Sequence, residues 1–104
     1  MLEAILMMYL RRGAAHGYDL AARLTECGFV GLNPGLVYRA LRGMEDLGWI
    51  RSAWDGEASH GPPRRVYSLA PPGEQAMEDL VRGFREIRGL IDKVIAAYEQ
   101  QAGC

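Results

Sequence analysis

The chain is short and nearly neutral, and these two properties narrow the classes of protein to which it can belong. Its 104 residues suffice for one domain with a single core. Hydrophobic residues make up 49% and charged residues 24% of the chain, a soluble composition that argues against disorder. Because 12 basic residues oppose 13 acidic ones, the net charge by itself gives no support to nucleic-acid binding.

Neither the start of the chain nor its cysteines indicate secretion or membrane insertion. The opening MLEAILMMYL is apolar but much shorter than the ~20 residues that span a bilayer. It also lacks the basic start and the small-residue cleavage site of a signal peptide. Cys27 and Cys104 could form at most one disulfide. We therefore expect a cytoplasmic protein with reduced thiols and no membrane contact.

Two helices are predicted in the first part of the chain. The first has apolar residues at helical spacing, namely Leu2, Ile5, Leu6, Tyr9 and Leu10. Gly13 stands where a helix C-terminus favours glycine, and the segment GAAHG reads as a turn. The second helix covers residues 18–27 and is closed by Gly28. Its inner face is expected to consist of Tyr18, Ala21, Ala22 and Thr25.

The stretch NPGLVYRALRGMEDLGWI, residues 33–50, predicts a third helix that runs into a strand. Asn33 is a good N-cap, and Pro34 suits the first helical position. One side of the helix is apolar and is expected to be buried, namely Val37, Ala40, Leu41, Met44, Leu47 and Gly48. The opposite side carries Arg39, Arg42 and Asp46, with Tyr38 on the shoulder.

After residue 48 the period of the pattern changes from 3.6 to 2. The segments WIRSAW and RRVYSL alternate, and the polar stretch DGEASHGPP separates them, which predicts a β-hairpin. Three helices followed by a hairpin are the order of a winged helix-turn-helix, with the third helix as recognition helix and the hairpin as wing. We expect this mainly α fold with a β-hairpin to form a DNA-binding domain over residues 1–70.

The remainder, residues 71–104, predicts a C-terminal dimerisation helix. Its apolar residues follow a heptad pattern, with Met77, Phe84, Ile91 and Tyr98 at one position and Leu80, Ile87 and Val94 at the other. A 25-residue helix of this kind is about 38 Å long, more than a domain of about 70 residues can cover. The stripe needs a partner, and a second copy of the chain is the simplest one.

Three blocks of the sequence carry a family resemblance. HGYDLAARL, NPGLVYRALRGMEDLGWI and GPPRRVYSLAPPGEQ occur in an order that closely resembles the PadR-like family of bacterial transcriptional regulators. The resemblance implies a dimeric winged-helix DNA-binding protein whose C-terminal helix packs against the N-terminal region of the partner. One departure is Ala70, which stands where the family usually has a threonine able to cap the last helix.

The candidate DNA contacts lie on the recognition helix and the wing. Arg39 and Arg42 can bind guanine edges or phosphate, although a solvated helix face is the alternative. We assign Arg39 to base edges and Arg42 to phosphate. For Tyr38, the family position implies a hydroxyl on a phosphate; packing into the core is the other interpretation.

The wing and the His-Gly-Tyr segment add three candidates. Of Arg64 and Arg65, one is expected to reach phosphate and the other, by strand alternation, to face the protein; a polar hairpin edge that prevents aggregation is the alternative. The family pattern implies a structural turn or a phosphate contact for His16. Two lone histidines and two distant cysteines predict neither a metal site nor a cofactor.

These observations predict a homodimeric repressor that binds a pseudo-palindromic double-stranded DNA operator. Relatives that sense aromatic compounds imply an effector site at the dimer interface, lined here by Met7, Met8, Tyr9, Phe84 and Tyr98; an ordinary dimer core is the alternative. No catalytic triad, phosphate-binding loop or carboxylate cluster occurs, so we do not expect an enzyme. The competing hypothesis is a winged-helix adaptor that binds proteins and not DNA.

Overall fold

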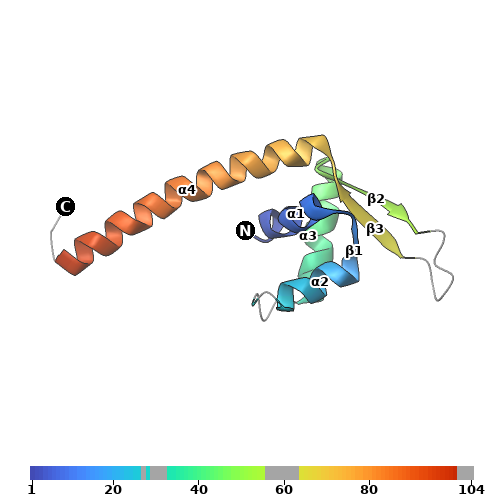
Figure 1. The fold of residues 1–104 in the computed structure, drawn as a ribbon, viewed down its shortest axis with the longest axis horizontal. Coiled ribbons are helices and arrows are strands. Elements are labelled where there is room, and N and C mark those ends of the chain that lie inside the picture. Colours follow the sequence, from blue (N-terminus) through green and yellow to red (C-terminus); the bar gives the residue numbers. More distant parts are fainter. Residues whose placement is uncertain (27, 29–32, 56–63, 101–104) are drawn as a thin grey trace.

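A computed structural model describes residues 1–26, 28, 33–55 and 64–100 of the chain. The elements in chain order are α1 (Leu2–Arg12), β1 (Ala15–His16), α2 (Gly17–Glu26), α3 (Pro34–Asp46), β2 (Ile50–Trp54), β3 (Arg65–Leu69) and α4 (Pro71–Gln100). The first three helices and the strands pack together, and α4 extends away from them (Figure 1). The fold is therefore mainly helical, and its longest dimension is 63 Å.

The three strands form one antiparallel sheet in the order β1-β3-β2. Within the wing, Ile50 pairs with Leu69 and Trp54 with Arg65, as expected for a hairpin. The strand β1 differs from the sequence expectation, which placed a turn at GAAHG. Ala15 and His16 pair with the free edge of β3 and satisfy backbone groups that would otherwise lack partners. The wing is thereby joined to the segment that leads into α2.

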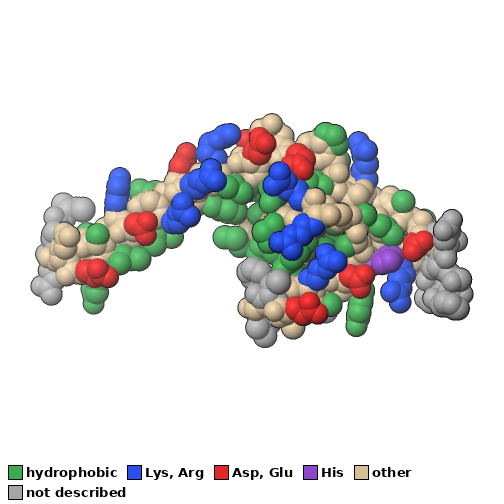
Figure 2. Space-filling model, viewed as in Figure 1, with side chains coloured by type: hydrophobic (Ala, Val, Ile, Leu, Met, Phe, Trp, Pro, Cys, Tyr) green, Lys and Arg blue, Asp and Glu red, His purple; other side chains and the backbone are tan. Residues whose placement is uncertain are grey.

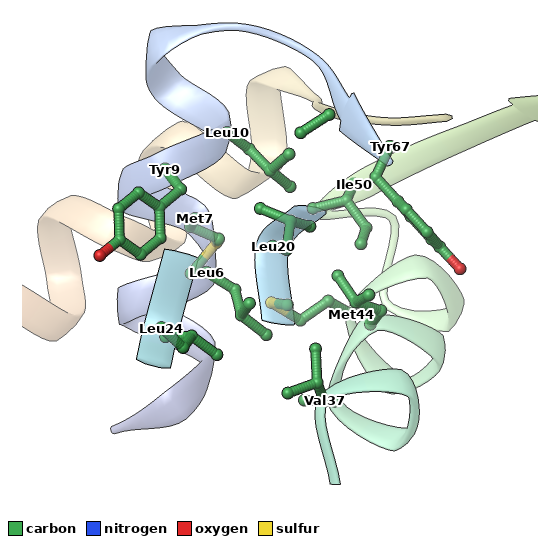
Figure 3. Packing of buried hydrophobic residues seen from close by; sticks show 13 residues of the cluster. Leu6, Met7, Tyr9, Leu10, Leu20, Leu24, Val37, Met44, Ile50 and Tyr67 are labelled. Carbon is green, nitrogen blue, oxygen red and sulfur yellow. The ribbon is translucent and has the colours of Figure 1, made fainter. Parts of the chain in front are cut away.

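One hydrophobic core connects these elements (Figure 3). The buried cluster comprises Leu6, Met7, Tyr9, Leu10, Ala15, Leu20, Leu24, Val37, Ala40, Leu41, Met44, Ile50 and Tyr67. The members are drawn from α1, α2, α3 and all three strands. Since burying one large apolar side chain stabilises a fold by about 1.5–3 kcal/mol, this cluster is sufficient to fix the relative positions of the helices and the sheet.

The predicted inner face of α2 was wrong at three of its four residues, and only Ala21 packs against the core. Tyr18 is 71% exposed, and Ala22 and Thr25 are exposed as well. The buried residues are instead Leu20 and Leu24, together with Gly17 at the start of the helix. Two leucines four residues apart bury more apolar area than alanine and threonine do, so they determine how the helix is rotated.

Helix α3 follows the predicted pattern over most of its length. The side chain of Asn33 caps it by accepting a hydrogen bond from the Gly35 N–H (2.7 Å). Val37, Ala40, Leu41 and Met44 are buried. The expectation that Leu47 and Gly48 extend this buried side was wrong, because the helix ends at Asp46 and both residues lie exposed in the turn that follows.

Helix α4 begins on a compact junction with the rest of the fold. The Ala70 carbonyl accepts hydrogen bonds from the N–H groups of Gly73 (2.9 Å) and Glu74 (3.2 Å), and the Ala70 N–H donates to the Trp49 carbonyl (2.9 Å). Backbone groups therefore cap the helix at the position where the threonine is missing. Arg11 of α1 pairs with Glu74 (3.1 Å) and holds the first turns of α4 on α1.

Gly73→Ala is expected to destabilise this junction. A methyl group at this position would overlap the Trp49 carbonyl oxygen and lie 2.7 Å from Leu69 Cδ1, so the first turn of α4 would have to move. Overpacking of this kind costs about 1–3 kcal/mol, which should lower the melting temperature by at least about 5 °C in thermal unfolding followed by circular dichroism.

The matched control is Gly89→Ala, also within α4, where a Cβ would meet nothing within 4 Å. Alanine is the better helix former, so this variant should melt at the wild-type temperature or above it. Equal melting temperatures for the two variants would contradict the proposed packing of the junction.

Candidate nucleic-acid interface

The outward side of α3 is formed by residues that lie opposite its buried side. Gly35, Arg39, Arg42 and Asp46 are all exposed there, as the helical spacing predicts. Within the described part of the chain, neither Arg39 nor Arg42 forms an ion pair. Both guanidinium groups are therefore available to a ligand, although Asp46 lowers the positive charge of this face.

Tyr38 lies on the side of α3 that faces the wing. It is 46% exposed, and its ring rests against Gly17, where an added Cβ would lie 2.8 Å from Tyr38 Cε1. The same Cβ would lie 3.4 Å from Tyr67 Cε2. The glycine of the His-Gly-Tyr segment thus leaves room for two tyrosine rings, one from the recognition helix and one from the wing.

The two wing arginines have different surroundings. Arg65 Nη1 donates to Ser52 Oγ (2.5 Å) and lies 3.9 Å from Glu45 Oε2. Its guanidinium also stacks 4.9 Å from the centroid of the Trp54 ring, and the Ser52 hydroxyl donates to Glu45. Arg65 therefore faces the protein and connects the wing to α3. Arg64, which precedes the strand, is exposed.

His16 lies between two carboxylates, beside the ends of β2 and β3 that lead into the loop between them. Its Nδ1 is 3.4 Å from Asp19 Oδ2 and its Nε2 is 3.4 Å from Asp55 Oδ2. Among the described residues, no group of three or more histidine, cysteine or acidic side chains has the arrangement of a metal site. The imidazole joins the start of α2 to the end of β2, which is a positioning role.

Tyr67 was not among the candidates from the sequence. It is only 7% exposed, and it packs between the core and Gly17. Burial, and next the nearby Glu45 carboxylate, raise the pKa of the Tyr67 hydroxyl, while Arg65 lowers it in part. The hydroxyl therefore keeps its proton at neutral pH. The available signal was the alternation along β3, which places Tyr67 on the same face as Arg65.

The heptad residues of α4 fall into two groups. Met77 and Leu80 are half-buried and pack on the core of their own chain, so part of the predicted interface is already used. Beyond Phe84, the residues Ile87, Ile91, Val94 and Tyr98 are exposed. Hydrophobic side chains follow the concave side of α4 (Figure 2). None of the helices within the described ranges is long and apolar enough to cross a membrane.

The five residues considered for an effector site are not brought together within one chain. Met7 and Tyr9 are buried in the core, whereas Met8 is exposed on the surface of α1. Phe84 is half-buried on α4, and Tyr98, 83% exposed, lies close to the far end of that helix. Only a second chain could place Tyr98 near the other members of the set.

Comparisons with known proteins agree with this architecture. Over residues 5–79 the sequence matches the model of the transcriptional regulator PadR-like family. A PadR family transcription regulator from Clostridium difficile shares 26% identity and a TM-score of 0.80, and the match covers 90% of this chain and 97% of that one. A PadR-like regulator from Bacillus cereus has 21% identity and a TM-score of 0.77, with 90% of each chain covered.

A third structure is that of Bacillus subtilis PadR in complex with operator DNA. It has 23% identity and a TM-score of 0.68, and the match covers 77% of this chain and 46% of that one. The comparison with curated proteins gives no match. Since the family model spans most of the chain and the fold agrees, the protein belongs to the PadR-like family of transcriptional regulators.

Proposed function

We propose that the protein is a homodimeric regulator that binds a specific operator in double-stranded DNA and represses transcription. The observation that carries this proposal is the outward face of α3, where Arg39 and Arg42 are exposed beside Tyr38. Exposed arginines can be a solvated helix face, but here they lie on the recognition helix of a winged fold. The Bacillus subtilis relative with this fold was solved with operator DNA, which supports the proposal.

We assign DNA binding and dimerisation to two consecutive parts of the chain. Residues 1–70 would bind DNA and residues 71–104 would form the dimerisation helix. In helix-turn-helix proteins the N-terminal part of the recognition helix contacts bases, so Arg39 is assigned to base edges and Arg42 to phosphate. The near-neutral net charge of −1 fits modest nonspecific affinity. A regulator of this kind would act in the cytoplasm and would need no catalytic activity.

The dimer is proposed from the exposed half of α4. Ile87, Ile91 and Val94 form a continuous apolar stripe with Leu90 and Ile95 beside it, and all five are exposed in one chain. Soluble monomers rarely expose large contiguous apolar patches. A second copy would bring an identical stripe, and a two-fold axis between the copies would bury both stripes against each other.

An effector at the dimer interface is proposed as the means of release. Of the five residues considered from the sequence, Met8, Phe84 and Tyr98 are accessible enough to line a site completed by the partner chain. Methionine and aromatic side chains adapt to flat apolar ligands. Met7 and Tyr9 belong to the core, so they would support the residues that line such a site and would not contact the ligand themselves.

DNA binding itself is tested by electrophoretic mobility shift with the DNA upstream of the gene for this protein, over a salt series. The logarithm of the affinity is expected to fall with the logarithm of the salt concentration, by roughly 0.9 for each phosphate neutralised. Weak binding that is insensitive to salt would support the alternative, a winged-helix adaptor that binds proteins.

Replacing either arginine of α3 with alanine is expected to weaken DNA binding, but in a different way for each residue. Arg39→Ala should cost about 1–3 kcal/mol on the preferred operator and relax base preference at one position of each half-site. Arg42→Ala should weaken all sequences nearly equally and make the salt dependence shallower. Selection from randomised DNA measures both effects, with Arg88→Ala on α4 as the control. An unchanged base preference in Arg39→Ala would refute the assignment.

Dimerisation is tested by placing aspartate at Ile87 and Ile91 together. Both side chains are exposed in one chain, so the winged core should remain folded while two buried charges in each subunit prevent assembly. Sedimentation at micromolar concentration should give a monomer, and circular dichroism should retain helix. The control is Lys93→Asp, outside the apolar stripe, which should remain dimeric. A wild-type monomer at that concentration would contradict the dimer.

A further inference from the structure

The hydrophobic core anchors the base and the middle of the wing but not its outer end, where β2 and β3 lead into the loop between them. Ile50 and Tyr67 are buried, and Leu69 packs against the core. At the outer end Trp54 pairs with Arg65, and both side chains are exposed. Hydrophobic packing alone therefore does not fix the angle between the outer end of the wing and α3.

A chain of polar contacts joins this outer end to the recognition helix. Glu45 lies in the last turn of α3 and accepts a hydrogen bond from the Ser52 hydroxyl of β2. Ser52 Oγ accepts one from Arg65 Nη1 of β3 (2.5 Å), and the same nitrogen lies 3.9 Å from Glu45 Oε2. The Trp54 ring covers the guanidinium at 4.9 Å. Both strands of the wing are thereby connected to one carboxylate of α3.

These contacts use properties that arginine has and lysine lacks. A planar guanidinium can stack on a ring while its N–H groups donate in the plane, whereas the lysine ammonium is a compact charge on a flexible stem. A phosphate contact would need neither the Trp54 ring nor the Glu45 carboxylate, and this carboxylate offsets the charge that attracts phosphate. The surroundings of Arg65 therefore favour an internal role for this side chain.

We propose that Glu45 and Arg65 are positioning residues for DNA binding, which hold the wing at a fixed angle to α3 and do not contact DNA. The proposal rests on the DNA binding proposed above. Arg64 is the residue through which they act, because it is exposed, directly precedes β3 and moves with the outer end of the wing. A wing that is ordered before DNA binds needs less ordering during binding, which increases affinity.

The test compares Arg65→Lys with Arg65→Gln in operator binding. Lysine keeps the charge but cannot stack and donate as arginine does, so a positioning role predicts a similar loss of affinity in both variants, about three- to tenfold. Lysine would support a phosphate contact as a point charge. Arg65→Lys that binds like wild type would therefore overturn the proposal, whether or not Arg65→Gln binds more weakly.

Glu45→Gln is a second arm, in which the competing interpretation predicts the opposite sign. If Arg65 bound phosphate, removing the carboxylate beside it would strengthen DNA binding and make the salt dependence steeper, by about 0.9 in the slope. A positioning role predicts weaker operator binding, because a neutral amide holds Ser52 and Arg65 less firmly. The matched control is Asp46→Asn, the same change of charge at the next residue, which should bind DNA more tightly. Equal or tighter binding by Glu45→Gln would overturn the proposal.

A double-mutant cycle tests whether Arg65 acts through Arg64. Arg64→Ala should weaken binding of the wild type to DNA of any sequence and make its salt dependence shallower. The same change should cost less in Arg65→Lys, because a displaced Arg64 has already lost part of its contact. Strictly additive losses would overturn the action through Arg64.

Folding and DNA binding are controlled separately. Because exposed ion pairs contribute little stability, Arg65→Lys and Glu45→Gln should melt within a few degrees of wild type, and binding is compared at a temperature where all variants are folded. Wild type that binds no operator at any salt concentration would overturn DNA binding and the positioning role together. The other contrary outcomes overturn the positioning role and leave DNA binding intact.

Discussion

The backbone carbonyl of Trp49 is the point at which the winged fold and α4 meet. It accepts a hydrogen bond from the Ala70 N–H (2.9 Å), while the Trp49 N–H donates to the Met44 carbonyl at the end of α3 (2.9 Å). Gly73, in the first turn of α4, lies against the same carbonyl without room for a side chain. The direction of α4 is therefore set by contacts that begin on the recognition helix.

A second set of contacts fixes the wing relative to α3. Glu45, Ser52 and Arg65 form a hydrogen-bonded chain, and Trp54 covers the guanidinium. An exposed ion pair contributes little stability on its own, since solvent screens it. Here these contacts serve mainly to fix the orientation of the Arg65 side chain. A guanidinium held by a hydroxyl, a carboxylate and a ring has few alternative orientations, so the wing and α3 present their exposed groups as one surface.

The sequence allowed the fold class and the exposed face of α3 to be predicted, for reasons that differ between elements. The rotation of α3 followed from large apolar residues at unambiguous spacing, with Asn33 marking its start. The exposure of Ile87 and Ile91 followed from a heptad that outruns the domain. In each case the local pattern and the tertiary packing agree, which is the condition under which such reasoning succeeds.

The predictions failed where tertiary packing decided between local options. In α2 the buried residues are Leu20 and Leu24, whereas the prediction placed Tyr18 on the inner face. The strand β1 forms because β3 offers a free edge with which it can pair. Tyr67 was not predicted as a site residue because a single aromatic residue in a strand usually belongs to the core. Its ring is core, but its hydroxyl borders a hollow assembled from three separate segments. No spacing within one segment can indicate such a convergence.

The rigid start of α4 gives the helix the properties of a lever. Its 30 residues correspond to a rod of about 45 Å at ~1.5 Å per residue, held at one end by Ala70, Gly73 and Glu74. A rotation of about 10° at the junction would displace the far end by about 8 Å. Conversely, a small shift between two such rods in a dimer would change the separation and tilt of the paired recognition helices. In the proposed dimer, an adjustment around one carbonyl oxygen would thus change the distance along DNA that the two halves of the protein can span.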